Sequence, residues 1–140
     1  MVISVALLAA CGGSSEEVAD RYRPVDLEQA QALRVNGYLW QASLETLSFM
    51  PFDSTDATGG VIVTDWYTHP SAPNERTKVR VTIMDAKLRA DALRVVVSRQ
   101  QQNAGTWIDA PVQQSTVAGL EDAILVRARQ IRIATVVDSD

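Results

Sequence analysis

Residues 76–85 read RTKVRVTIMD, and the side chains of the first eight positions alternate between two sets. A period of two residues is typical of a β-strand, because successive side chains of a strand point to opposite faces. One set is basic and polar and the other is mainly apolar, which predicts a half-buried antiparallel strand with one face in water. The wet face would carry Arg76, Lys78 and Arg80, and the buried face Thr77, Val79, Val81 and Ile83.

Three more strand-like runs lie around this stretch. Residues 61–68 are rich in β-branched and aromatic side chains, which favour strands. Residues 93–101 alternate again, and residues 103–105 (NAG) suit a tight hairpin turn that leads into a short fourth strand at residues 106–110. Residues 52–60 hold two glycines and several small polar residues, and we expect a loop there.

Two helices flank the predicted sheet. The first covers residues 36–49 with Asn36 as its N-cap, and the second, with Ser115 or Thr116 as its N-cap, runs to about residue 134. This order predicts an α+β domain, an antiparallel sheet of three to four strands with two helices packed on one face. Apolar residues recur at helical spacing in both helices, as Trp40, Leu44 and Leu47 and as Val117, Leu120, Ile124 and Ile131.

The amino-terminal residues look like a bacterial lipoprotein signal. Residues 2–10 are almost wholly apolar, which fits the core of a signal peptide and is far short of the roughly 20 residues that span a bilayer. Two alanines and then Cys11 follow Leu8, and in such signals the cysteine takes a diacylglyceryl group. No Lys or Arg precedes the apolar run, so we expect the true start to lie upstream. The alternative is an apolar terminus followed by an ordinary buried cysteine.

Lipidation would also account for the cysteine usage. Cys11 is the only cysteine of the chain, and a lone thiol in an exported protein is a hazard unless it is consumed. Gly12 stands where an Asp usually retains lipoproteins at the inner membrane, so we expect a lipid anchor on the periplasmic face of the outer membrane. The expected organisation is a signal peptide at 1–10, a lipidated tether at 11–35 with a short helix after Asp26, an α+β domain at 36–135 and a tail at 136–140.

Composition and motifs argue against several functions. The net charge of −4 at pH 7 gives no basic bias toward nucleic acid. The single histidine, His69, stands in a loop beside Pro70 without a second histidine or a nearby cysteine, which disfavours a zinc or histidine-based catalytic site. Asp53 and Asp56 lack the spacing of a calcium loop. We therefore expect no cofactor, no metal and no enzymatic activity.

The basic row of the central strand is the first candidate contact surface. Arg76, Lys78 and Arg80 would lie side by side on one face, and Arg94 on the next strand could extend the row. Such a row could contact acidic headgroups, lipopolysaccharide phosphates or an acidic protein partner. The alternative is a solvated sheet face whose charges are balanced by neighbouring Asp and Glu residues.

Trp66 is the second candidate contact. An exposed Trp on a sheet face would suggest a partner contact, because Trp and Tyr are common anchors of interfaces. In the alternative arrangement Trp66 packs under a helix and Asp65 points outward. An outward Trp66 would share its face with Ile62 and Thr64, leaving Val61, Val63 and Tyr67 toward the core.

A set of segments is distinctive in combination: residues 36–40 (NGYLW), 47–51 (LSFMP), 59–62 (GGVI), 64–67 (TDWY), 88–94 (LRADALR), 107–111 (WIDAP) and the helix 120–133. Together they resemble a family of small proteobacterial lipoproteins described only as a domain of unknown function, which implies no activity and no catalytic residue. The helix-strands-helix order is also similar to the helix-grip domains of a lipoprotein in the outer-membrane β-barrel assembly machine. That likeness is one of topology, which does not fix function.

The leading hypothesis is a non-enzymatic interaction or accessory module of the cell envelope that supports outer-membrane protein or lipopolysaccharide assembly. A closed core with an exposed Trp66 or basic strand face would favour it. The alternative is a periplasmic binding module for a lipid or small apolar ligand, which a large apolar groove between sheet and helix would favour. A third hypothesis is an envelope hydrolase, which would need two converging carboxylates from among Glu45, Asp65, Asp85 and Asp91.

Overall fold

A computed structural model describes residues 35–138. The predicted signal peptide, Cys11, the tether with its helix after Asp26, and residues 139–140 of the predicted tail lie outside the described residues. The described chain forms, in order, α3 (Gly37–Thr46), β1 (Phe52–Asp56), β2 (Val61–Thr64), β3 (Glu75–Ile83), the short 3-10 helix η2 (Ala90–Ala92), β4 (Leu93–Asn103), β5 (Thr106–Ala110) and α4 (Gln114–Val137).

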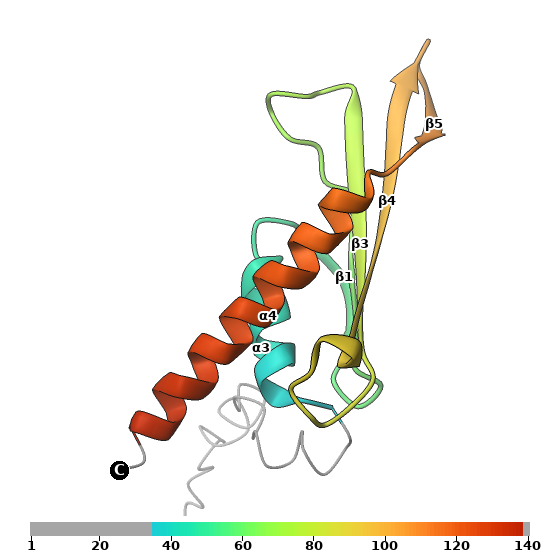
Figure 1. Cartoon of the computed structure of the whole chain (residues 1–140). Helices are drawn as coiled ribbons and strands as arrows, with labels where there is room; N and C mark the ends of the chain where they lie inside the picture. Colours follow the sequence, from blue (N-terminus) through green and yellow to red (C-terminus); the bar gives the residue numbers. More distant parts are fainter. Residues whose placement is uncertain (1–34, 139–140) are drawn as a thin grey trace, which may run out of the picture.

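The strands form one antiparallel sheet in the spatial order β1-β2-β3-β4-β5, so each strand pairs with the next one along the chain. Helices α3 and α4 pack against each other and lie on one face of this sheet, with α4 crossing it diagonally (Figure 1). The α+β class and the placement of both helices on one face are confirmed. The sheet has five strands rather than three or four, because a strand forms where we expected a loop.

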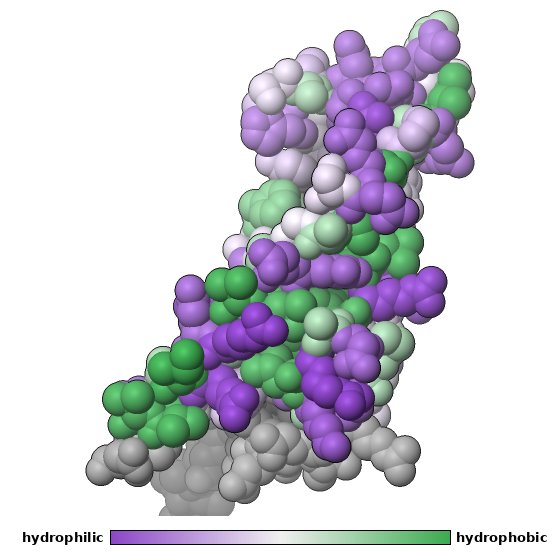
Figure 2. Space-filling view, viewed as in Figure 1, coloured by the Kyte–Doolittle hydropathy of each residue, from purple (hydrophilic) through white to green (hydrophobic). Residues whose placement is uncertain are grey.

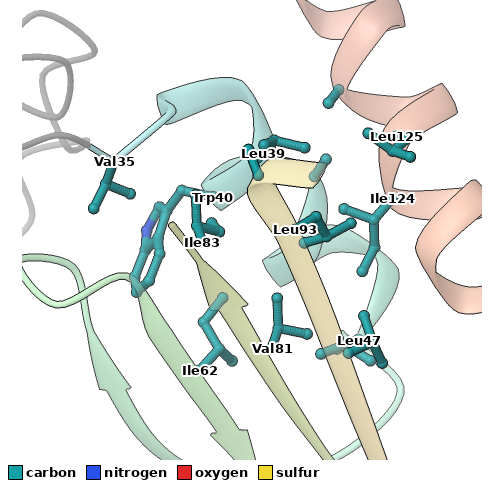
Figure 3. Packing of buried hydrophobic residues seen from close by; sticks show 14 of the residues in the cluster. Val35, Leu39, Trp40, Leu47, Ile62, Val81, Ile83, Leu93, Ile124 and Leu125 are labelled. Atoms are coloured by element: carbon teal, nitrogen blue, oxygen red, sulfur yellow. The ribbon is translucent and has the colours of Figure 1, made fainter. Parts of the chain in front are cut away.

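The alternation of β3 sorts its side chains as predicted. Val79, Val81 and Ile83 are buried on the helix side, and β4 brings Val97, Val95 and Leu93 directly opposite them. Apolar side chains paired across two antiparallel strands and covered by helices form the centre of the core. Figure 3 shows how this layer meets the helices, with Leu39 and Leu47 contributed by α3 and its C-terminal turn, and Ile124 and Leu125 by α4.

Asn36 caps α3 as predicted. Its side-chain Oδ1 accepts a hydrogen bond from the backbone N–H of Leu39 at 2.9 Å, and its Nδ2 donates to the carbonyl of Ala86 at 2.9 Å. One buried side chain therefore satisfies an orphan donor of the helix and ties the helix start to the loop after β3. The helix ends at Thr46 rather than near residue 49, because a turn at residues 47–49 leads the chain into β1.

The prediction of a loop over residues 52–60 is wrong for its first half. Phe52–Asp56 is strand β1, which pairs with β2 from Phe52↔Thr64 to Asp56↔Val61 and carries an irregularity between Phe52 and Ser54. All five residues of β1 are exposed, so the strand has no apolar alternation that could reveal it. Backbone pairing with β2 alone makes this segment a strand, and it is an edge strand of polar composition, which discourages further pairing.

The side chains of β2 face opposite to one of our expectations. Ile62 and Thr64 are fully buried on the helix side, whereas Val61 and Val63 are half-buried on the other face. The strand ends at Thr64, and a two-residue irregular segment separates it from an isolated bridge between Tyr67 and Thr77. Because of this irregular segment, the side chains after Thr64 do not continue the inward–outward alternation of β2.

Thr64 has a structural role that predicts a measurable effect. Its Oγ1, fully buried, accepts a hydrogen bond from the backbone N–H of Val79 at 2.9 Å. Replacing Thr64 with valine keeps the volume but leaves that N–H without a partner, so the free energy of unfolding should fall by about 1–3 kcal/mol. Urea unfolding followed by circular dichroism measures it. Thr64→Ser keeps the hydroxyl and should be the milder change, and the reverse order of stabilities would contradict this role.

Helix α4 starts two or three residues earlier than predicted and ends later. Gln113 occupies the N-cap position without a side-chain hydrogen bond, so neither Ser115 nor Thr116 is the cap. The predicted apolar face is confirmed, since Ile124 and Ile131 are buried and Val117 and Leu120 pack partly buried against the core. The helix continues to Val137. Within residues 35–138 neither helix is both long and apolar enough to cross a bilayer.

Candidate functional site

The face of the sheet opposite the helices gathers the predicted contact residues. Arg76, Lys78 and Arg80 alternate along β3 on this face, and Arg94 of β4 lies opposite Thr82 and so joins them. Val96, which is opposite Arg80, is 45% exposed, so no described element covers the middle of this face. We call the surface made by Arg76, Lys78, Arg80, Arg94, Trp66 and Trp107 the basic sheet face.

Arg76 lies over two indole rings. Its guanidinium carbon is 4.5 Å from the ring centre of Trp66 and 4.4 Å from that of Trp107. Trp66 follows β2 on one side of β3 and Trp107 belongs to β5 on the other, so the two rings approach the guanidinium from opposite sides. Each contact is a cation–π interaction of about 0.5–1 kcal/mol at an exposed site. Lys78 Nζ lies 5.8 Å from the Trp66 ring centre and extends the cluster along β3.

A hydrogen-bonded chain fixes the orientation of Arg76. Its Nε donates to Gln100 Oε1 at 2.8 Å, and Gln100 Nε2 donates to Asp109 Oδ1 at 2.9 Å. Gln100 of β4 lies opposite both Arg76 of β3 and Asp109 of β5, so this chain of hydrogen bonds runs across three adjacent strands. The side chain of Arg76 is therefore held in one position by two rings and one hydrogen bond, with its terminal nitrogens left for another acceptor.

The cations of the basic sheet face have no carboxylate partner within residues 35–138. The ion pairs found there involve Arg89, Arg99 and Arg127, and Asp109, an acid of the same face, bonds to Gln100. Our alternative of a solvated face balanced by neighbouring Asp and Glu residues stays a prediction, because strand pairing places Asp109 and Asp56 on the same face. Four cations and the two carboxylates of Asp56 and Asp109 share this face, so its cations outnumber its acids although the chain has net charge −4.

The alternation break after Thr64 decides the place of Trp66. Trp66 does not pack under a helix; it lies beside Arg76 on the basic sheet face, half-buried, while Tyr67 turns to the helix side and pairs with Thr77. Of the two arrangements considered, the packing of Trp66 under a helix is wrong, and an outward Trp66 with an inward Tyr67 is the one found. The residues expected to share the outward face with Trp66 do not do so, because Ile62 and Thr64 lie on the helix side.

Trp107 is the member of the site that sequence reasoning missed. The signal was present in the hairpin, where Ala104 and Gly105 both have positive φ, as a two-residue turn requires. Such a turn fixes the register between β4 and β5. Trp107 therefore lies opposite Gln102, two residues along β5 from Asp109, which pairs with Gln100. Counting this register back from residues 103–105 would have placed Trp107 on the face of Arg76.

On the helix side of the sheet, a half-open cleft lies between α4 and the segment that follows α3. It has a volume of about 260 Å³ and a mainly apolar lining. Phe49 and Tyr67 meet edge to face with ring centres 5.4 Å apart at its wall, and Tyr67 meets His69 in the same way at 6.4 Å. We call this the helix–sheet cleft; its lining is Phe49, Met50, Tyr67, His69, Ala72, Glu75, Thr77, Val79, Val97, Thr116 and Leu120.

The remaining candidate residues have ordinary surroundings. His69 is an exposed loop residue whose Nδ1 accepts a hydrogen bond from the backbone N–H of Ser71. Asp56 accepts bonds from two N–H groups of its own turn. Within residues 35–138 no three or more His, Cys, Asp or Glu side chains come close enough to hold a metal ion. Of the four carboxylates considered for hydrolysis, Asp85 and Asp91 pair with Arg89, Glu45 pairs with Arg127, and Asp65 bonds to the N–H of Trp66.

The pair of Glu45 and Arg127 joins α3 to α4. The hydrogen bond from Arg127 holds the pKa of the Glu45 carboxyl below its usual range, with a further contribution from Gln41. A lowered folded-state pKa means that the pair stabilises the fold fully above the unfolded value, near 4.3, and loses this effect as the pH falls through the folded value.

Glu45→Gln should therefore lower stability at neutral pH and flatten its dependence on pH below about 4.5. Because both side chains are more than a third exposed, the expected change at pH 7 is only about 0.5 kcal/mol. Urea unfolding at a series of pH values measures it. Asp122→Asn, an exposed acid on α4, is the matched control and should leave the curve unchanged. An equal effect of both substitutions would contradict a specific role of the pair.

The described fold matches a known family over nearly all of its length. Residues 33–133 fit the family model described as a domain of unknown function, DUF3576. The chain belongs to this family. An uncharacterised protein of Rickettsia prowazekii (strain Madrid E) is 39% identical over 108 residues, which cover 77% of this chain and 65% of the relative. The chain therefore spans just under two thirds of that relative's length. The resemblance to a family of unknown function is confirmed, and DUF3576 carries no named activity.

Proposed function

We propose that this member of the DUF3576 family is a lipoprotein anchored through Cys11 on the periplasmic face of the outer membrane. Its domain acts as a non-enzymatic interaction module of the cell envelope and contacts an acidic partner through the basic sheet face. The anchor rests on the apolar residues 2–10 and the small residues before Cys11. The interaction rests on a single structural observation, the stacking of Arg76 between Trp66 and Trp107 on an uncovered sheet face.

This arrangement suits binding because Arg and Trp are the residues that most often dominate protein interfaces. An arginine that is free to move loses rotamer freedom when it binds an acid, which weakens binding. Arg76 has already lost that freedom, since two rings and Gln100 hold it. A carboxylate or phosphate that meets its terminal nitrogens would form a charge-assisted hydrogen bond without further ordering of the side chain.

The spacing of the cations favours an extended acidic protein segment as the partner. Alternate residues of a strand lie about 6.8 Å apart, so Arg76, Lys78 and Arg80 form a row at that interval. Acidic side chains at alternate positions of an extended chain recur at the same interval and would meet the row in register. Among envelope components, a protein of the outer-membrane assembly machinery that presents such a segment fits best, and lipopolysaccharide phosphates are the competing outcome.

Co-purification from cells tests the interaction. The tagged full-length protein is crosslinked in intact cells and its partners are identified by mass spectrometry. The variant with Arg76, Lys78 and Arg80 all replaced by serine should lose a stoichiometric envelope protein. A control with Lys87, Arg89 and Arg99 replaced by serine removes the same charge away from this face and should retain it. Equal recovery by both variants, or lipopolysaccharide as the co-purifying species, would overturn the acidic-protein partner.

The anchor is tested separately. Metabolic labelling with a radioactive fatty acid should label the wild-type protein, and the label should disappear in Cys11→Ser. Fractionation of the envelope should place the labelled protein in the outer membrane. Absence of label from the wild type, or its recovery in the inner membrane, would contradict the proposed anchor or its destination.

The helix–sheet cleft favours a second candidate function, the binding of a lipid or small apolar ligand. Its mainly apolar lining with a few polar side chains is typical of ligand sites. The test is a titration with a fluorescent apolar probe such as anilinonaphthalene sulfonate. One saturable site that is lost in Leu120→Trp, with an unchanged far-ultraviolet circular dichroism spectrum, would support this function. Probe binding that does not saturate, or that is the same in Leu120→Trp as in the wild type, would exclude ligand binding in this cleft.

A further inference from the structure

Helix α4 is longer than the core that it covers. Its buried residues end at Ile131, whereas the helix continues to Val137. Four large apolar side chains of this C-terminal half are exposed, and Figure 2 shows apolar atoms gathered at the helix end. We call them the outer stripe of α4; they are Val126 (43% exposed), Ile133 (64%), Val136 (55%) and Val137 (66%).

The outer stripe lies on the side of α4 that faces away from the domain. Val126, Ile133 and Val137 are separated by seven and four residues, so at 100° per residue they fall within about 20° of one line along the helix, and Val136 lies about 80° to one side of it. The buried residues Ala128 and Ile131 lie on roughly the opposite side. A helix that is apolar on both sides is normally covered on both, yet no element of residues 35–138 covers the outer stripe.

The charges beside the stripe indicate what covers it. Arg129 and Arg132 lie along one side of it, the side of Val136, and are exposed; residues 123–137 contain no Asp or Glu, and the exposed Asp138 follows the last turn. An apolar stripe bordered by arginines is the composition of a helix that lies in the headgroup region of an anionic bilayer. A second copy of the chain fits less well, because helices packed through this stripe would bring arginines of like charge together.

The position of the stripe agrees with this composition. The C-terminal end of α4 and the start of the described chain at Val35 lie at the same end of the molecule, and the β4–β5 hairpin lies at the other (Figure 1). We infer that the outer stripe of α4 docks on the surface of an anionic lipid bilayer. The inference rests on the proposed lipid anchor, which would hold this end of the domain near the membrane. The cation–π contacts of Arg76 with Trp66 and Trp107 would then face away from the membrane.

Site-specific fluorescence on the full-length chain tests the docking. In a Cys11→Ser background, Val137→Cys carries an environment-sensitive dye, and Gln102→Cys near the hairpin tip carries it in the control. Vesicles of phosphatidylcholine with or without phosphatidylglycerol contain a lipid-attached quencher. Residues 2–10 are the same in every sample, so differences in quenching report the helix itself.

The dye at position 137 should be quenched in vesicles with phosphatidylglycerol, and the dye at position 102 should not. Each arginine near an anionic surface changes the docking equilibrium about fivefold, so Arg129→Ser with Arg132→Ser should lower the ratio of quenched to unquenched dye about thirty-fold. Equal quenching at both positions, or none at 137, would overturn the inference. Shielding of the dye at position 137 in the absence of vesicles would also overturn the inference. Shielding that does not depend on protein concentration would indicate that residues 1–34 cover the stripe, and shielding that does depend on it would indicate a second copy of the chain. None of these outcomes bears on the partner of the basic sheet face, which co-purification tests separately.

Discussion

Replacing Ile124 with alanine should lower the free energy of unfolding by about 2–5 kcal/mol. Ile124 is fully buried, and Figure 3 shows it pointing from α4 toward the sheet near Leu93 and Leu47. The truncation removes apolar surface and leaves a cavity where α4, α3 and β4 meet, and a rigid sheet on one side limits how far the site can collapse. Urea unfolding monitored by circular dichroism measures the change.

Ile133→Ala is a matched control, because it makes the same chemical change on the same helix at a side chain that is 64% exposed. Its effect should stay within about 0.5 kcal/mol. A large loss from Ile133→Ala with a small one from Ile124→Ala would mean that α4 packs on the domain through its outer stripe. That result would contradict both the fold and the inferred membrane contact.

Gly60→Ala should cost about 2–4 kcal/mol, for two independent reasons. Gly60 has φ +69°, where a side chain is strained, and a Cβ at this position would lie 2.5 Å from the carbonyl oxygen of Ile83. The backbone approaches closely here because the N–H of Ile83 donates to the carbonyl of Gly60 at 2.7 Å. Since the obstacle is backbone, the sheet must shift to admit a methyl group.

Two other glycines separate these causes. Gly105 has φ +81° but open space where a Cβ would lie, so Gly105→Ala should cost only about 1 kcal/mol, from the backbone conformation. Gly119 lies within α4 with open space, and Gly119→Ala should stabilise the protein by about 0.5–1 kcal/mol. Thermal unfolding should therefore rank the variants Gly119→Ala, Gly105→Ala and Gly60→Ala from most to least stable. Equal losses at Gly60 and Gly105 would contradict the close approach of the backbone.

The parts of the fold that local patterns determine were predictable from the sequence. The alternation of residues 76–83 fixes both faces of β3, and the polar side chain of Asn36 before an apolar helical stripe marks the start of α3. The turn at residues 103–105 joins β4 to β5 as expected. In each case neighbouring residues alone carry the signal, through side-chain periodicity, capping or turn conformation.

The parts that depend on tertiary pairing were not predictable. Nothing in the polar composition of β1 distinguishes it from a loop, because its only structural requirement is backbone pairing with β2. The inward position of Thr64 depends on a hydrogen bond to Val79, fifteen residues away along the chain. A buried hydroxyl at a position that reads as polar therefore reverses the expected faces of β2.

The same division holds for the candidate site. The row Arg76, Lys78 and Arg80 follows from alternation along one strand and could be identified directly. The stack of Arg76, Trp66 and Trp107 needs residues from three parts of the chain. The turn between β4 and β5 fixes the face of Trp107, but its contact with Arg76 depends also on the long-range pairing of β3 with β4. The helix–sheet cleft likewise forms only where α4 crosses the sheet, so the sequence could suggest a groove but not its lining.

The central claim, that the basic sheet face binds an acidic protein, is tested most directly by photo-crosslinking from single positions in living cells. A photoreactive amino acid replaces Ser98, which lies opposite Lys78 in the middle of this face, or Ser115, which is exposed at the start of α4 on the other side of the sheet. We predict a discrete crosslinked envelope protein from position 98, lost when Arg76, Lys78 and Arg80 are serine, and none from position 115. No protein crosslink from position 98, or the same crosslink from both positions, would contradict the claim.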